Sequence, residues 1–473
     1  MTAGPDAIEV EKPMSKARTG APGLERSATV RSALERFASG TDRETMARGQ
    51  LERIADPSGE GRRAFLKVYE DAADVAARYD RDAKSGQSIP RYAGVTISIK
   101  DLFDVAGDVT TSGSTLLKDA APAARDAEVV ARLKSAGFVP VGRTNMTEFA
   151  FSGLGINPHY GTPLNPYDRA SQRIPGGSSS GAAVSVSDGM ATVALGTDTG
   201  GSCRIPAALC GLVGFKPTAT RVPPSGTMPL STSLDSIGSI GHSVACCAAV
   251  DEVISGECFA PSHVDLSSLT FAVPSSYVFD GIDQPTAAAF DRALSRLSAA
   301  GVNIVTADMP EFHDIPTINP KGGLAAREAY LYHRRWLEER GGEYDPRVLV
   351  RILKGESQSD TDYRDVQQAR RDLIERARAN SGRYDAVVMP TVPTIAPTLD
   401  ELAEDDPYGR INLLMLRNPT IANMLDRCAI SLPCHEPGEA PVGFMLMGPT
   451  SGDHRLLAVA ARIEGCLASA QPG

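Results

Sequence analysis

From residue 95 almost to its carboxyl end, the chain alternates between short β-branched segments and longer segments with helical spacing. Residues 95–99 read VTISI, in which apolar and hydroxyl side chains alternate as they do in a strand with two different faces. Residues 126–137 then have helical spacing, and FVPVG follows as another strand. The same order returns in the second half, from LTFAVP to a closing helix that begins at Asp453. This alternation predicts an α/β fold with a mixed, mostly parallel central β-sheet covered by α-helices on both faces.

The first ninety residues have a different texture. Residues 1–26 are rich in Gly, Pro, Ala and charge without any period, so we expect a loosely ordered leader. The pattern of residues 27–88 predicts a helical region with three helices. The first begins at Ser27, the second begins with a capping box in TDRE (41–44), and the third runs from about Gly61 to Gly86. We expect residues 27–473 to form a single domain, since large α/β enzymes often do.

Composition limits the partners of the chain. Its formal charge of -10 comes from 58 acidic and 48 basic residues without a long block of one sign, which argues against nucleic acid and against an anionic membrane. The amino terminus lacks the layout of a secretory signal and no run of about 18 uncharged apolar residues follows, so we expect a cytoplasmic protein. The eight cysteines lack a C-x-x-C pair and lie mostly in apolar stretches, which favours free buried thiols.

The stretch PGGSSSG (175–181) has three interpretations. A Gly/Ser-rich heptapeptide is more often a linker, but structured apolar segments flank this one. A phosphate-binding loop would need a lysine after Gly181, and none is there. A nucleophile elbow centred on Ser179 would need a histidine base, for which His435 and His454 come late enough in the chain, and a preceding strand, where the sequence instead reads as loop.

Two further segments carry groups suited to acyl transfer. TDTGGSCRIPAALCG (197–211) places two glycines before Ser202, and backbone N–H groups free of side chains beside a hydroxyl are what an oxyanion hole requires. TISIKDLFDVAG (96–107) places Lys100 at the end of an alternating strand, where a side chain can enter a cleft at the edge of the sheet. Burial there can leave such a lysine neutral and able to act as a base, although a surface salt bridge is the commoner role of a lone lysine.

Together, SIKDLFDVAG, GRTNMTEFAFSG (142–153), PGGSSSGAA and GTDTGGSCRIPAALCGLVGFKPT (196–218) resemble the amidase signature family of Ser-Ser-Lys hydrolases. The resemblance is dense over residues 90–240, moderate over 385–465 and weak in the variable region 255–385. It implies a hydrolase that acts on linear amide C–N bonds and uses no metal or cofactor. The expected nucleophile is Ser202, the bridging residue Ser178, which follows a cis peptide bond, and the base Lys100.

The resemblance also implies roles for the neighbours of these three residues. The expected oxyanion hole consists of the backbone N–H groups of Thr199, Gly200, Gly201 and Ser202. An ion pair between Asp198 and Arg204 is expected to brace the nucleophile loop, although Arg204 could instead hold a substrate carboxylate. Gly177 permits the bend before Ser178, and Ser179 is expected to support the loop by hydrogen bonds.

The sequence leaves three functions open. The first is a stand-alone amidase that releases ammonia or an amine from a small-molecule carboxamide and that forms, by family resemblance, a possible homodimer. The second is the glutaminase subunit of a tRNA amidotransferase, because TSLDSIGS (232–239) resembles motifs of both branches. The third is a catalytically inactive binding module, against which the intact Lys100, Ser178 and Ser202 argue. The carboxyl-terminal motifs, which resemble general amidases, favour the first.

The substrate pocket is expected to be lined or covered by the variable region 255–385. Within it, Tyr330, Tyr332, Arg334 and Trp336 could meet a ring or a carboxylate of the substrate. At helical spacing, such residues more often form a packing face with a solvated edge.

Overall fold

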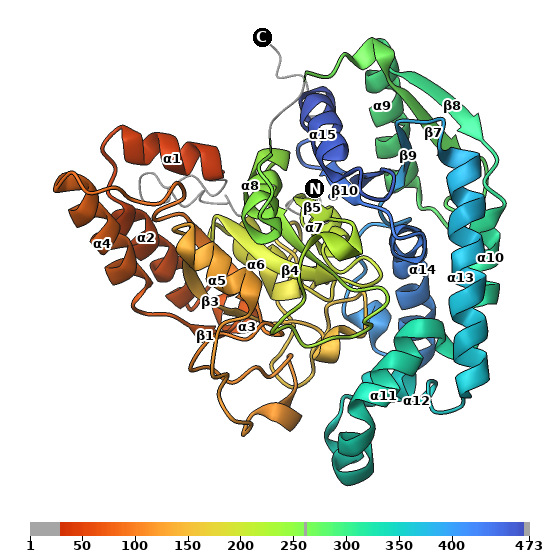
Figure 1. Cartoon of the computed structure of the whole chain (residues 1–473), viewed down its shortest axis with the longest axis horizontal. Coiled ribbons are helices and arrows are strands. Elements are labelled where there is room, and N and C mark those ends of the chain that lie inside the picture. Colours follow the sequence, from red (N-terminus) through yellow and green to blue (C-terminus); the bar gives the residue numbers. More distant parts are fainter. Residues whose placement is uncertain (1–28, 260–262, 468–473) are drawn as a thin grey trace, which may run out of the picture.

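The computed structural model describes residues 29–259 and 263–467, which surround one eleven-stranded sheet (Figure 1). The strand order is β1-β3-β2-β4-β6-β5-β10-β11-β9-β7-β8. The strands are β1 (Phe65–Val68), β2 (Thr96–Lys100), β3 (Val139–Thr144), β4 (Val193–Asp198), β5 (Val213–Lys216), β6 (Ser236–Gly241), β7 (Thr270–Pro274), β8 (Asn303–Ala307), β9 (Ala386–Pro390), β10 (Ala429–Pro433) and β11 (Gly443–Met447).

Fifteen α-helices connect and cover the strands in the described residues. They are α1 (Val30–Ala38), α2 (Arg43–Ala55), α3 (Gly61–Ala64), α4 (Ala72–Lys84), α5 (Glu128–Ser135), α6 (Ser180–Ser187), α7 (Arg204–Leu209), α8 (Val244–Ser255), α9 (Gln284–Ala299), α10 (Glu311–Ile318), α11 (Gly323–Arg340), α12 (Pro346–Leu353), α13 (Asp360–Ser381), α14 (Asp405–Met424) and α15 (Asp453–Leu467).

The sheet is mixed, and the predicted predominance of parallel strands holds only within two blocks. Parallel pairing joins β3-β2-β4 and β9-β7-β8, whereas six of the ten pairings in the described chain are antiparallel. The reason is connection length. A parallel crossover needs about a dozen residues or more, while only residues 434–442 join β10 to β11, so these two strands pair antiparallel.

Helices cover both faces of the sheet, as predicted, and alternate residues of the same strand belong to different cores. Val388 of β9 and Phe444 of β11 pack in a cluster with residues of α8, α9 and α15. Their neighbours Met389 and Met445 pack in another with residues of α10, α13 and α14. Because side chains alternate along a strand, a sheet with helices on both faces needs apolar residues at consecutive positions, as in AVVMP and GFMLM.

The amino-terminal region departs from the expected three helices. The predicted third helix is broken into α3, the edge strand β1 and α4, because residues 65–68 pair antiparallel with β3. The predicted capping box at 41–44 is not formed, since α2 follows Asp42, whose side chain makes no cap hydrogen bond. Thr29 and Ser32 instead form a capping box on α1. The leader at 1–26 and Ser27 lie outside the described residues.

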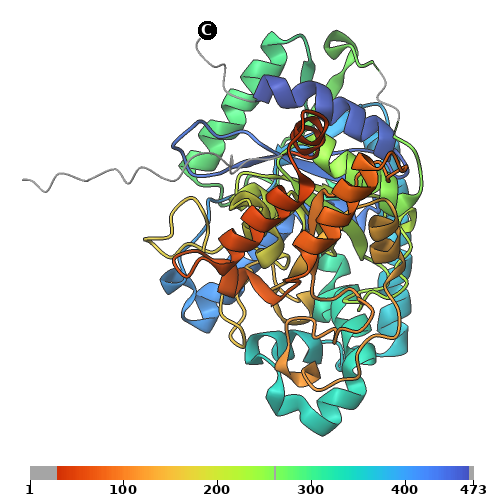
Figure 2. The same ribbon diagram turned by 90° about the vertical axis from the view of Figure 1, so that its left-hand side faces the viewer.

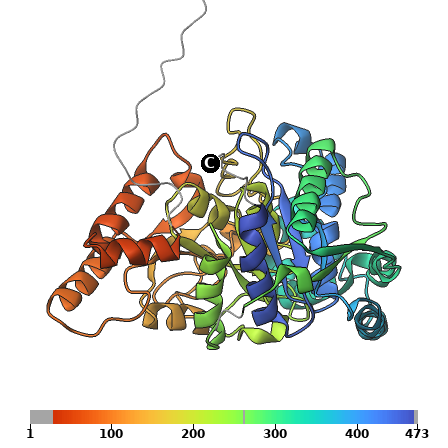
Figure 3. The ribbon, with the colours of Figure 1, turned by 90° about the horizontal axis from the view of Figure 1, so that it is seen from above.

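The helices that flank the sheet separate into two ends. Helices α1, α2 and α4 lie at one end, and α10, α11 and α13 lie at the other (Figure 1). Figure 2 looks onto the first end and shows α2 and α4 in front of the remaining elements. Seen from above, the first helices and those of the second half again lie apart (Figure 3). None of the helices in the described residues is both long enough and apolar enough to cross a membrane.

Candidate active site

Lys100 is the last residue of β2, and the strand's alternation turns it away from the apolar core. Ile97 and Ile99 pack in the core that contains α5 and α8. On the opposite face, Ser98 Oγ lies 2.8 Å from Ser185 Oγ of α6. Lys100 continues this polar face and is fully buried. The alternation of β2 therefore places the Lys100 amine on the face of the sheet that packs against α6.

The Lys100 amine lies between two hydroxyl groups. Its Nζ donates to Ser178 Oγ at 2.8 Å and to Thr197 Oγ1, at the end of β4, at 2.9 Å. No carboxylate of the described residues lies within ion-pair distance of it. Burial lowers the pKa of Lys100 to about 8, against which the more distant charges of Asp198 and Asp235 act. Roughly a tenth of this amine is therefore neutral at pH 7 and can accept a proton.

A tightly packed loop holds Ser178 in this position. The Gly177–Ser178 peptide bond is cis, as the resemblance implies. Gly177 N donates to Gly153 O at 2.8 Å, and Thr147 N donates to Ser178 O at 3.1 Å, so the 142–153 motif forms one wall of the loop. A Cβ atom at position 177 would lie 2.4 Å from the backbone nitrogen of Gly155, which leaves room only for glycine.

Ser202 lies in the turn between β4 and α7. It is nearly buried, with 3% of its surface exposed, and its carbonyl accepts a hydrogen bond from Ser179 N at 3.3 Å. That bond ties the turn to the loop that carries Ser178. Gly201 has a φ of +126°, and a Cβ there would approach Pro419 Cβ to 2.6 Å. The described residues contain no direct hydrogen bond between the Ser178 and Ser202 hydroxyl groups.

A buried ion pair braces the turn from below. Arg204 Nη2 and Nε donate to the two carboxylate oxygens of Asp198 at 2.8 and 3.0 Å, and both side chains are fully buried. Asn423 of α14 completes the group, since its Nδ2 donates to Asp198 O at 2.9 Å and its Oδ1 accepts from Arg204. Burial opposes ionisation of Asp198, but Arg204 outweighs it and holds the pKa of this carboxyl well below its usual range. This geometry gives Arg204 a supporting contact and no opening toward a substrate carboxylate.

The four expected oxyanion donors are not equivalent. Gly201 N already donates to Asp198 Oδ1 at 2.9 Å, so the expectation for this residue is corrected: its N–H supports the loop. Within the described chain, the N–H groups of Thr199, Gly200 and Ser202 make no hydrogen bond. Gly200 is the partly exposed member of the turn. These three groups are left as candidates to hold a developing oxyanion.

The nucleophile-elbow alternative finds no support in the geometry. Ser179 Oγ donates to Thr197 O at 3.5 Å, a contact within the loop. His435 Nδ1 accepts from Val442 N at 3.4 Å, and His454 Nε2 lies 2.8 Å from Arg221 Nη2. Neither histidine therefore hydrogen-bonds to a serine of the 178–180 segment in the described residues.

Three residues near the site were not singled out from the sequence. Thr197 contacts Lys100, and Asn423 contacts the Asp198–Arg204 pair, as described above. Asp235 Oδ1 accepts from Thr199 Oγ1 at 2.5 Å and so anchors the start of the turn that carries Ser202. Thr197 and Asp235 lie in motifs that the sequence already marks, whereas Asn423 comes 219 residues after Arg204 and carries no local signal.

The comparisons with known proteins agree with this geometry. The family model described as Amidase matches residues 51–457. The chain belongs to the amidase signature family. A solved structure described as an amidase superimposes on 93% of this chain and 99% of its own, with a TM-score of 0.83 and 29% identity. As a member of this family, the chain is a hydrolase that acts on C–N bonds.

Two kinds of curated amidase-family relatives are similar over most of the chain. The 2-amino-5-chloromuconic acid deaminase of Comamonas testosteroni is 37% identical over 407 residues, which cover 84% of this chain and 86% of that protein. The A-type subunit of the glutamyl-tRNA(Gln) amidotransferase of Koribacter versatilis is 32% identical over 86% of this chain and 91% of that protein.

Two expectations from composition and spacing can also be compared with the structure. All eight cysteines are free, and six of them are buried, as predicted. In α11, Tyr330 and Trp336 pack against a buried core, while Arg334 pairs with Glu338 at the surface. These residues therefore form a packing face with a solvated edge, which was the alternative to a contact with the substrate.

Proposed function

We propose that this chain is a stand-alone amide hydrolase that releases ammonia or an amine from a small carboxamide through an acyl-enzyme on Ser202. The observation that carries the proposal is the buried Lys100 amine, whose pKa burial lowers to about 8 and whose Nζ lies 2.8 Å from Ser178 Oγ. A lysine in this state is suited to act as a base toward a hydroxyl group.

In the proposed mechanism, neutral Lys100 accepts the proton of Ser178 while Ser178 accepts that of Ser202. Ser202 Oγ then forms a bond to the carbonyl carbon, and the oxyanion is held by the N–H groups of Thr199, Gly200 and Ser202. When the C–N bond breaks, Ser178 returns a proton to the departing nitrogen. Water repeats the relay and releases the carboxylic acid, so the protein groups end in their starting states.

One relative supports ammonia as the released product. By its name, the Comamonas relative removes the amino group of 2-amino-5-chloromuconic acid, and it is more similar to this chain than the Koribacter protein described above. We propose accordingly that the chain acts on a free small molecule and requires no partner protein. The similarity to the tRNA amidotransferase keeps glutaminase activity as the second candidate.

The proposal is tested by incubating the purified chain with aryl and alkyl amides and measuring ammonia. We expect turnover without a partner, covalent labelling of Ser202 by phenylmethylsulfonyl fluoride, and loss of both in Ser202→Ala. The matched control is Ser180→Ala, because Ser180 belongs to the same serine cluster and its Oγ hydrogen-bonds, among the described residues, only to Asn145 O, at 3.5 Å. If no amide releases ammonia and the wild-type protein is not labelled, the inactive binding module is favoured. Glutamine turnover that needs a partner protein would favour the glutaminase.

A further inference from the structure

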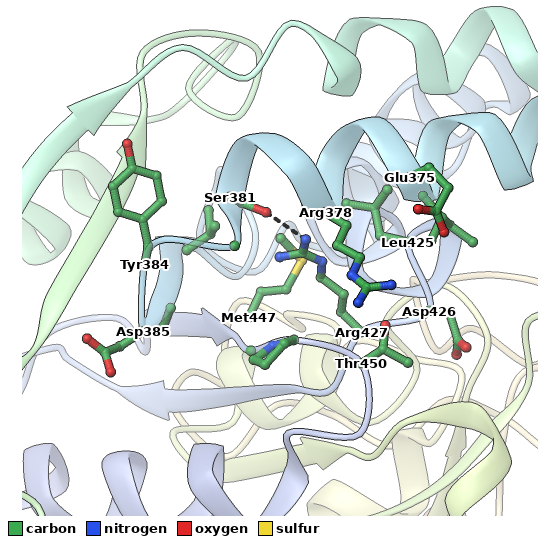
Figure 4. A pocket seen from close by; sticks show the side chains of 16 residues that line it. Glu375, Arg378, Ser381, Tyr384, Asp385, Leu425, Asp426, Arg427, Met447 and Thr450 are labelled. Carbon is green, nitrogen blue, oxygen red and sulfur yellow. Dashed lines mark hydrogen bonds between the residues drawn. The ribbon is translucent and has the colours of Figure 1, made fainter.

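A cavity of about 580 Å³ lies outside the candidate active site (Figure 4). Its walls come from the end of α13, the start of β9, the segment after α14 and the segment after β11. None of Lys100, Ser178 and Ser202 lines it. Its volume falls within the range of about 300–1,000 Å³ that is typical of small-molecule sites.

Arg427 is a buried cation on the wall of this cavity. Only 7% of its surface is exposed. Figure 4 shows its guanidinium among the lining residues, with a hydrogen bond to Ser381. Its Nη2 donates to Ser381 Oγ at 2.6 Å and to Ala377 O at 3.1 Å, and both acceptors are neutral. In the described residues, its Nε and Nη1 donate to nothing.

Arg427 differs in this respect from the other buried arginines. The described chain buries four arginines, and three of them have a carboxylate partner within 2.8 Å. Those three are Arg143, Arg204 and Arg327. No described carboxylate lies within 4 Å of Arg427. Burial lowers the pKa of Arg427, as expected for a cation whose surroundings do not replace its lost hydration. A buried charge of this kind is normally paired, so the free Nε and Nη1 edge of this guanidinium is suited to binding an anion.

The lining of the cavity limits which anion fits. Val387, Leu425 and Met447 supply apolar walls, which suit a hydrocarbon body. Glu375, Asp385 and Asp426 also line the cavity, together with a second cation, Arg378. The three acids outnumber the two arginines and disfavour a multiply charged group such as phosphate. Of these acids, Asp385 is already engaged, because it accepts from Thr270 N at 2.9 Å and pairs with Arg455. A single carboxylate on a compact apolar body matches both features.

We infer that this cavity is a second binding site, selective for small monocarboxylates, in which the free edge of the Arg427 guanidinium holds the carboxylate. The charge-assisted hydrogen bonds would satisfy Nε and Nη1, and the apolar remainder would lie against Val387, Leu425 and Met447. This site does not depend on the proposed function, since it shares no lining residue with the catalytic groups.

The test measures benzoate binding by calorimetry in the full chain carrying Ser202→Ala, which prevents covalent chemistry. Arg427→Met removes the guanidinium, and Thr450→Trp fills the cavity from its exposed rim while keeping Arg427. Arg383→Met is the matched control, because Arg383 lies over the ring of Tyr384 and does not line the cavity. We expect the first two substitutions to weaken benzoate binding at least about tenfold and the control to leave it unchanged.

Benzyl alcohol, the neutral probe of similar shape, should bind at least about tenfold more weakly than benzoate. Equal benzoate affinity in Thr450→Trp and the parent would overturn the inference, because binding would then lie elsewhere, as in the active site. So would the absence of measurable binding of acetate, hexanoate and benzoate to the parent. If Arg427→Met does not fold, as judged by circular dichroism, Thr450→Trp decides.

Discussion

Lys100 is an amine in a place where water cannot solvate its charge. Its hydrogen-bond partners, Ser178 and Thr197, are neutral hydroxyl groups, which compensate for little of the lost hydration of the charged amine. The pKa of Lys100 therefore falls to about 8. The amine is therefore a useful base only in the fraction of molecules that have lost the extra proton. This condition links a structural property of one residue to the pH dependence of the proposed reaction.

The rate of Ser202 labelling by phenylmethylsulfonyl fluoride should rise with pH and level off above about 8, because the neutral amine is the active form. Below that pH the rate should fall by about tenfold for each pH unit. Lys100→Met should label slowly and without this rise. A bell-shaped profile centred near pH 6.5 would instead indicate a histidine base.

The Asp198–Arg204 pair should matter for stability as well as for catalysis. Asp198→Asn leaves the fully buried Arg204 without a counter-charge, which should lower the free energy of unfolding by about 3–5 kcal/mol. Urea denaturation measures the effect. Glu339→Gln, which breaks the exposed pair with Arg335, is the control and should leave the midpoint unchanged. Equal midpoints for the two variants would contradict the bracing role.

At the scale of elements, one carboxylate joins the variable region to the signature core. Glu328 of α11 is 8% exposed and accepts hydrogen bonds from Ser231 Oγ at 2.6 Å, Ser233 N at 3.0 Å and Tyr363 OH of α13 at 2.7 Å. The segment bound by Glu328 continues to Asp235, which accepts a hydrogen bond from the Thr199 hydroxyl group. Helices α11 and α13 are thereby connected to the nucleophile turn.

Glu328→Gln replaces one accepting oxygen by an NH2 group, so at least one of these donors loses its acceptor. We expect the free energy of unfolding to fall by about 1–3 kcal/mol. Ser202 labelling should also slow several-fold, since the turn at Thr199 loses part of its support. The control on the same helix is Glu338→Gln, at an exposed side chain paired with Arg334. Unchanged labelling in a folded Glu328→Gln protein would show that α11 does not position the turn.

At the scale of the whole molecule, distant parts of the chain interlock within one sheet. Strand β10 pairs with β5, although some two hundred residues separate them, and Asp453 at the start of α15 accepts hydrogen bonds from Thr218 N and Oγ1 at 2.8 and 2.7 Å. The signature core and the carboxyl-terminal part therefore both contribute strands to the same sheet, and these strands pair with one another. This interlocking supports the prediction that residues 27–473 form one domain.

The single tryptophan, Trp336 of α11, offers a test of that prediction. Its fluorescence reports on one end of the molecule, while far-ultraviolet circular dichroism reports on all helices. If the chain is one cooperative unit, both signals should change at the same urea midpoint. Two separated transitions would instead indicate independent domains.

Local patterns were sufficient to predict much of this protein. Alternation in VTISI predicted a strand with Lys100 at its end, where the side chain can enter a cleft, and the repeated order of strands and helices predicted an α/β fold with covered faces. The family motifs predicted the roles of the serines and the lysine, because these residues lie within short, contiguous segments. In each case the decisive contacts or spacings span only a few neighbouring residues.

The tertiary structure alone decided what depends on residues far apart in the sequence. It showed that β1 breaks a predicted helix by pairing with β3, that six pairings among the described strands are antiparallel, and that the Gly201 N–H is committed to Asp198. It also brought Asn423 under the turn that carries Ser202, and it left Arg427 buried with no described carboxylate within ion-pair distance. The physical reason is that strand partners, burial and the pairing of charges are set by packing between segments, which local propensity does not encode.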